Sequence, residues 1–140
     1  MTQPFTHAGQ HTRPVRVRRT VTVIGAAVLA MIVWTICVPA LGIELVAGSG
    51  ASTQRVGPAA VAVVPLIAGA LAWTLLAALE KVRTIGRRIW LVIGCVVLAL
   101  SLVGPITMAT SVGALITLLA MHLIVGTTLL VGLFSAGKNA

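Results

Sequence analysis

The chain has 140 residues, of which 59% are apolar and only 9% are charged. Soluble domains average about 45–50% apolar and about 25% charged residues. A short chain has much surface for its core, so this little charge cannot cover a water-soluble domain. The apolar content also excludes a disordered chain, and two cysteines are too few for a disulfide framework. We therefore expect an integral membrane protein of a single domain.

The charged residues fall in a few clusters, and the uncharged segments between them have the length of membrane spans. Residues 20–43 and 56–79 are uncharged segments of 24 residues each. As helices they measure about 36 Å, enough to cross a hydrocarbon core of about 30 Å with some tilt. These segments are the first two predicted transmembrane helices.

The third apolar stretch, 89–137, has 49 residues and is too long for one crossing. A helix of that length measures about 73 Å, so the chain must turn back once. Glycine, proline, threonine and serine gather in 105–111, a composition typical of a turn. We therefore predict two further spans, 89–106 and 112–134, in a transmembrane domain that covers 20–137. The expected fold is an all-α, integral membrane, antiparallel four-helix bundle.

The basic residues predict the orientation of this bundle. With four spans, both tails and the middle loop share one side, and that side holds nine of the ten Lys and Arg residues. Arg55 lies on the other side, accompanied by Glu44. Because basic residues stay in the cytoplasm, both termini are expected there, with 1–19 as a disordered basic tail. The basic residues expected to face anionic lipid headgroups are Arg13, Arg16, Arg18, Arg19, Lys81, Arg83, Arg87 and Arg88.

Two other interpretations of the basic segments are weaker. A basic tail, an apolar run and Val38-Pro39-Ala40 together resemble a secretory signal with its cleavage site. The run of about 20 residues exceeds the usual 7–15, and three spans follow, so an uncleaved first helix is favoured. A nucleic-acid partner is not expected, because the clusters abut the spans and contain no recognition motif.

The spans contain no Asp, Glu, Lys or Arg, so the carboxylate that couples many small transporters to protons is absent. His122 lies midway along the fourth span, and its imidazole is expected to face the bundle. Ser101 lies at a similar depth in the third span, and its carbonyl loses its helical donor because Pro105 has no N–H. We predict a contact between Ser101 and His122 at this break. Gly126, one turn after His122, is expected to admit a neighbouring helix.

Two roles are open for this contact. In the structural role, a neutral His122 donates to Ser101 or to its carbonyl and holds the third and fourth helices together. In the functional role, His122 belongs to a ligand or proton site. The structural role is favoured, because one histidine without a carboxylate partner is a poor proton relay.

The sequence offers little to a metal, a cofactor or a catalyst. The methionines, cysteines and His122 are soft-ligand types, but their spacing follows no ligand motif. Cys37 and Cys95 differ in depth by about 17 Å, far beyond the 7 Å limit for a disulfide. No nucleophile elbow, phosphate loop or carboxylate pair is present. We expect no bound metal or cofactor and no enzymatic activity.

Several stretches resemble a known family: RVGPAAVAVVPLIAGALAWTLLAALE from Arg55, the basic loop ending at Trp90, SLVGP from Ser101 and MHL from Met121. Their order is similar to that in a family of small four-helix membrane proteins, widespread in actinobacteria and catalogued only as a domain of unknown function. The resemblance covers about 20–134. It implies four spans in a bacterial inner membrane and no assigned activity. It draws attention to Ser101, Pro105 and His122.

The expected function is that of a non-enzymatic, multi-pass protein of the bacterial cytoplasmic (inner) membrane. It would be an accessory or scaffold subunit, bound to a membrane-protein partner, or a homo-oligomer. The alternative is a carrier or channel for a small apolar or weakly basic solute, with His122 and Ser101 lining the path. A hydrated cavity that reaches His122 would favour transport, whereas a dry, close-packed bundle would favour the structural role.

Overall fold

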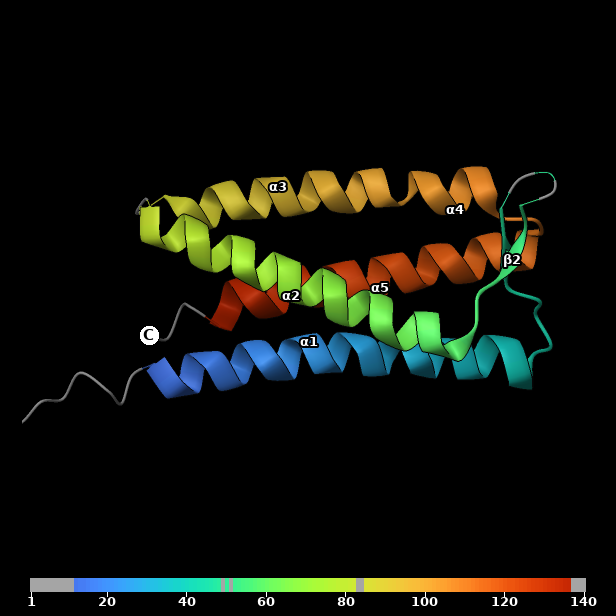
Figure 1. The fold of residues 1–140 in the computed structure, drawn as a ribbon, viewed down its shortest axis with the longest axis horizontal. Helices are drawn as coiled ribbons and strands as arrows, with labels where there is room; N and C mark the ends of the chain where they lie inside the picture. The colour runs from blue at the N-terminus through green and yellow to red at the C-terminus, as the bar shows by residue number, and fades with distance from the viewer. Residues whose placement is uncertain (1–11, 49, 51, 83–84, 137–140) are drawn as a thin grey trace, which may run out of the picture.

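The computed structural model describes residues 12–48, 50, 52–82 and 85–136, which form an antiparallel bundle (Figure 1). In chain order the elements are α1 Thr12–Thr35, the π-helix η1 Ile36–Ala40, β1 Val46–Ala47, β2 Gln54–Arg55, α2 Pro58–Val82, α3 Gly86–Ser101, α4 Val103–Met108 and α5 Val112–Ala136. Among the described residues, four segments are long and apolar enough to cross a membrane: Val15–Ala40, Pro58–Lys81, Gly86–Met108 and Val112–Ala136. The predicted all-α, four-span fold is confirmed.

The helices pack in a ring in which α1 and α3 do not adjoin. α1 packs against α2 and α5, and α3 packs against the same two helices from the other side. Figure 1 shows α1 beginning, α5 ending and α2 joining α3 at one end of the bundle, which we call the terminal end. The opposite end, which we call the hairpin end, contains residues 41–57 and 109–111.

The first helix begins earlier than predicted. The tail 1–19 was expected to be disordered, but α1 starts at Thr12, so this prediction is wrong for 12–19; residues 1–11 lie outside the described residues. α1 therefore begins before the apolar segment. Side-chain hydroxyls in this part bond within the helix: those of Thr20 and Thr22 donate to the carbonyls of Arg16 and Arg18 at 3.0 and 2.9 Å.

The third span breaks where proline was expected to break it, but it does not turn there. α3 ends at Ser101, and α4 continues in nearly the same direction to Met108, so the turn occupies 109–111 rather than beginning at Pro105 (Figure 1). Pro105 is the third residue of α4. In the first turn of a helix an N–H has no intrahelical acceptor, so proline is tolerated at this position.

A short antiparallel hairpin covers the hairpin end. Val46 of β1 pairs with Arg55 of β2, and Ala47 pairs with Gln54 on one side and bridges Ala109 on the other. The loop between the first two spans is thereby joined to the turn between α4 and α5.

The interior is filled by apolar side chains in three clusters along the bundle. Small residues such as Ala26 and Ala30 are fully buried and let α1 approach its neighbours. Trp90, Leu76 and Leu133 form the cluster nearest the terminal end. Many large apolar side chains are exposed on the outside of the bundle, as expected for helices in contact with lipid chains.

Candidate functional site

The contact between α3 and α5 is built around two glycines. Leu98 of α3 lies against Gly126 of α5, and Leu130 of α5 lies against Gly94 of α3; a methyl group on either glycine would collide with the facing leucine. The expectation that Gly126 admits a neighbouring helix is confirmed. The two contacts lie one turn apart on both helices. They therefore define the register along which α3 and α5 pack.

This register brings the predicted polar residues to one level. One turn further, His122 lies opposite Leu102, next to Ser101, because the two helices run antiparallel. Leu102 is the residue at which α3 gives way to α4. The structure therefore places His122, Ser101 and the helix break at the same depth, as the sequence indicated.

The predicted bond between Ser101 and His122 is nevertheless not formed. The Nδ1 of His122 donates to the carbonyl of Leu118 at 2.7 Å, and the hydroxyl of Ser101 donates to the carbonyl of Leu98 at 2.7 Å. No hydrogen bond links the two side chains among the described residues. Each finds a closer acceptor on its own helix, a common habit of polar side chains in helices.

The break explains why the Leu98 carbonyl is available to Ser101. In a continuous helix the N–H of Leu102 would donate to Leu98, but it donates to Ala99 at 3.3 Å instead. The Ser101 hydroxyl takes its place. Because a carbonyl only accepts, the bond of His122 to Leu118 requires a proton on Nδ1, and in a neutral imidazole Nε2 is then an acceptor.

A second polar site, which the sequence analysis missed, lies at the terminal end between α1 and α2. The Nη2 of Arg19 donates to both carboxylate oxygens of Glu80, at 3.0 and 2.8 Å. The two side chains are 7% and 28% exposed. Arg19 was assigned to the lipid-facing residues, but its guanidinium is buried in the bundle, because this carboxylate attracts it inward.

Arg87 was also predicted to face lipid headgroups, but it contacts α5 instead. It donates to the carbonyl of Phe134, and its guanidinium carbon lies 4.8 Å from the centroid of the Phe134 ring. Phe134 lies in the last turn of α5, where carbonyls lack intrahelical donors and a positive charge is favoured. Arg87 therefore stabilises the end of α5, in addition to stacking on its aromatic ring.

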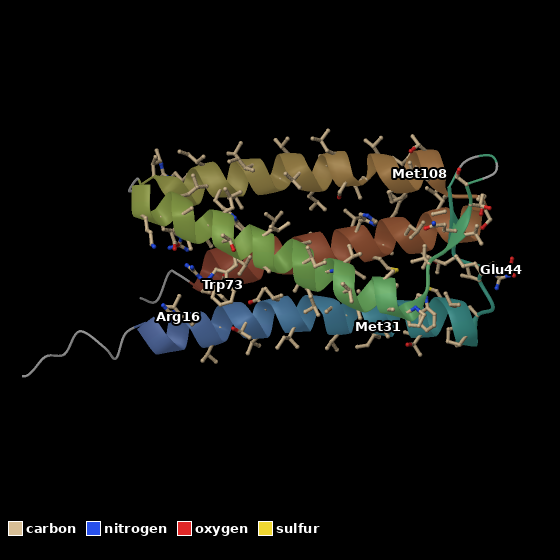
Figure 2. All side chains as sticks on the ribbon, in the orientation of Figure 1. Arg16, Met31, Glu44, Trp73 and Met108 are labelled. Atoms are coloured by element: carbon tan, nitrogen blue, oxygen red, sulfur yellow. The ribbon has the colours of Figure 1, made fainter. Side chains whose placement is uncertain are left out.

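The two arginines belong to one circuit of contacts around the terminal end. Gly86 packs on the backbone of Leu79 and Glu80, which joins α3 to α2, and Gly132 packs on Thr22, which joins α5 to α1. Figure 2 shows nitrogen and oxygen atoms gathered at this end, near the labelled Arg16 and Trp73. We define the polar ring as Arg19, Glu80, Arg87 and the Phe134 carbonyl.

The other predicted basic residues are partly described. Arg16, Arg18, Lys81 and Arg88 are exposed at the terminal end. The side chains of Arg13 and Arg83 lie outside the described residues. Cys37 and Cys95 are both free thiols. Within the described ranges, no three His, Cys, Asp or Glu side chains are grouped so that they could hold a metal ion.

A signal for the ion pair was present in the sequence. Glu80 is the only carboxylate among nine basic residues on its side of the membrane, and it ends an apolar span. A carboxylate in that position needs a cationic partner, because an unpaired charge near hydrocarbon is unfavourable. The sequence did not indicate which cation would reach it, since that depends on how α1 and α2 pack.

Comparison with known proteins gives one match. Residues 10–138 match the model of a family of unknown function, DUF6069. No curated protein and no solved structure matches the chain.

Proposed function

The chain belongs to the family of unknown function DUF6069, and we propose that it is a non-enzymatic structural protein of a bacterial inner membrane. In this proposal it acts as an accessory or scaffold subunit or as a homo-oligomer. Both termini lie in the cytoplasm, and the exposed basic residues of the terminal end contact anionic lipids.

The observation that carries this proposal is the closed interior of the bundle. The part-buried hydroxyl of Ser101 and the Nδ1 of His122 bond to carbonyls of their own helices. Polar groups satisfied in this way present little to a passing solute. Contacts also close both ends, through the polar ring and through the hairpin.

A groove on the described surface also favours a structural role. It has a volume of about 530 Å³ and lies on the outer side of α1, where Ala62 and Leu66 of α2 form its other wall. Thr35 is its one polar lining residue, and neither His122 nor Ser101 lines it. This groove opens toward lipid and gives no path along the bundle.

The test is purification of the full chain in mild detergent, followed by mass measurement of the particles in lipid nanodiscs. We expect either a single mass above that of a monomer or a second membrane protein in stoichiometric amount. A monomer without a partner would contradict the proposal.

The carrier alternative has one observation in its favour. The Nε2 of His122 has no hydrogen-bond partner in the described residues and lies beside the helix break. If the protein carries weak bases, proteoliposomes should take up methylamine faster than empty liposomes, and His122→Leu should abolish the difference. Equal uptake in all three preparations is the outcome that the structural role requires.

The orientation is tested by thiol labelling of intact cells. In a chain with Cys37→Ala and Cys95→Ala, Ser52→Cys at the hairpin end is expected to react with a membrane-impermeant maleimide. Arg88→Cys at the terminal end is expected to react only after lysis. The opposite pattern would reverse the proposed topology.

A further inference from the structure

α2 and α3 separate toward the hairpin end. Near the terminal end, Trp90 of α3 packs with Leu76 of α2 and Leu133 of α5. Val97 comes two turns after Trp90 and lies on the same face of α3, but it is 58% exposed, whereas Trp90 is 1% exposed. α2 therefore no longer covers α3 at the level of Val97. Figure 1 shows the divergence, since α2 adjoins α3 at the terminal end and reaches α1 at the hairpin end.

His122 and Ser101 lie on the sides of their helices that border this separation. His122 comes 11 residues before Leu133, and Ser101 comes 11 residues after Trp90. Eleven residues complete three helical turns to within about 20°, so each residue shares a face with the member of the cluster on its own helix. Both side chains are half-buried. We call this place the α2–α3 opening, bordered by Val97, Ser101 and His122, and it faces the lipid.

The Nε2 of His122 is accessible in this opening. The Nδ1 of the same ring donates to the Leu118 carbonyl, and Nε2 has no partner in the described residues. In that part of the chain, the buried side-chain nitrogens without a partner belong to Arg19 and Arg87, so Nε2 is not covered by protein atoms. A ligand that binds Nε2 therefore breaks no contact within the protein.

We propose that the α2–α3 opening binds a neutral, lipid-soluble molecule whose hydroxyl group donates to the Nε2 of His122. In a neutral imidazole with its proton on Nδ1, Nε2 accepts and does not donate, so the ligand supplies the hydrogen. The Ser101 carbonyl is a second acceptor at this level, because Pro105, four residues on, has no N–H. Two acceptors without a donor select a hydroxyl over an ether or a ketone.

Depth and charge narrow the class of ligand. His122 lies 10 residues after Val112, the start of α5, which is about 15 Å into a hydrocarbon core of about 30 Å. Phospholipid headgroups stay at the surface, so the hydroxyl belongs to a molecule dissolved in the hydrocarbon. No Asp or Glu on α3, α4 or α5 balances a cation, which disfavours an amine. A hydrophobic phenol or alcohol meets both conditions. It enters from the lipid side, so its binding does not depend on the carrier alternative.

The test follows the His122 imidazole by nitrogen-15 NMR of the full chain in lipid nanodiscs. His7→Gln and His11→Gln leave His122 as the only labelled histidine. The probe is 2,6-diisopropylphenol. The first control is its methyl ether, which has nearly the same shape but no O–H group, and the second is octylamine, which represents the weak bases.

Two tryptophan variants test the place of binding. Val97→Trp fills the opening with a large side chain. Val92→Trp adds the same side chain to another face of α3, at a residue that is 64% exposed. Circular dichroism and size-exclusion profiles show that each variant is folded.

We expect the phenol to shift the Nε2 resonance upfield in a saturable way. The methyl ether should bind about tenfold more weakly, the effect of one lost hydrogen bond to a half-buried acceptor. Val97→Trp should abolish the response, and Val92→Trp should change the dissociation constant less than about twofold. Equal responses to phenol and ether, a response to octylamine alone, or a response that survives Val97→Trp would overturn the proposal. A resonance that already has the position of a bonded nitrogen and does not move would assign the site to water instead.

Discussion

The two ends of the bundle are held by different interactions. At the terminal end the contacts come from charged side chains: Arg19 binds Glu80, and Arg87 binds the end of α5. At the hairpin end they come mainly from the backbone: the N–H of Gly48 donates to Met108 at 2.9 Å and that of Val56 donates to Leu45 at 2.8 Å.

Each end contains an ion pair, and the two pairs differ in burial. The Arg55 and Glu44 side chains are 79% and 73% exposed, whereas those of Arg19 and Glu80 are 7% and 28% exposed. Because water screens an exposed ion pair, such a pair contributes little to the free energy of unfolding. A buried charge, in contrast, is strongly destabilising when its partner is removed. The comparison teaches that the terminal end couples whole helices, while the hairpin end closes a loop.

The largest expected effect comes from Glu80→Leu. It leaves the buried guanidinium of Arg19 without its carboxylate, so the free energy of unfolding in detergent should fall by about 3–5 kcal/mol. Glu44→Leu is the matched control at the other end, where a loss of about 0–1 kcal/mol is expected. Thermal unfolding measures both, and equal losses would erase the distinction between the two pairs.

Replacing one glycine at each end by alanine should sharpen the comparison of the two ends. A Cβ at Gly86 would collide with the Leu79 carbonyl, and a Cβ at Gly48, which has a φ of 141°, would collide with the Ser52 carbonyl. Gly86→Ala should lower the free energy of unfolding by about 1–3 kcal/mol, because α2 and α3 must separate. Gly48→Ala should mainly open the hairpin, seen as faster proteolysis there at an unchanged melting temperature of the bundle. If Gly48→Ala lowered the melting temperature of the bundle as much as Gly86→Ala does, the two ends would be coupled.

A smaller effect is expected from Trp34→Phe. The Nε1 of Trp34 donates to the carbonyl of Val56 at 3.1 Å and anchors the loop before α2 to α1. Losing this bond should cost about 1 kcal/mol. Trp90→Phe removes the equivalent bond, from Nε1 to the Ala72 carbonyl at 3.0 Å, in the cluster near the terminal end. Proteolysis of the loop should rise with Trp34→Phe alone; a similar rise with Trp90→Phe would argue against a local role.

The smallest expected effect is a gain. A Cβ at Gly25 in α1 meets no atom within 4 Å, so Gly25→Ala introduces no clash. Alanine favours the helix by about 0.5–1 kcal/mol relative to glycine. Thermal unfolding should show this increase. A decrease would indicate that α1 approaches another surface at Gly25.

The candidate site was predictable in part. The missing N–H of Pro105 and the depth of His122 located a polar level in the third and fourth spans, and α3 does end at Ser101. The hydrogen-bond partners were not predictable, because each side chain has acceptors within its own helix and across the interface. The choice depends on how closely α3 and α5 approach at this level, which the packing at Gly94 and Gly126 determines.

The sequence by itself determined that this chain has four membrane-length helices. Span length, the lack of charge within spans and the clustering of basic residues are local properties that hydrocarbon selects for, whatever the packing. Only the tertiary structure decided which charges pair. Arg19 and Arg18 are neighbours in one basic cluster, yet one is buried against Glu80 and the other is exposed. That difference follows from the rotation of α1 about its axis, which its contacts with α2 and α5 establish.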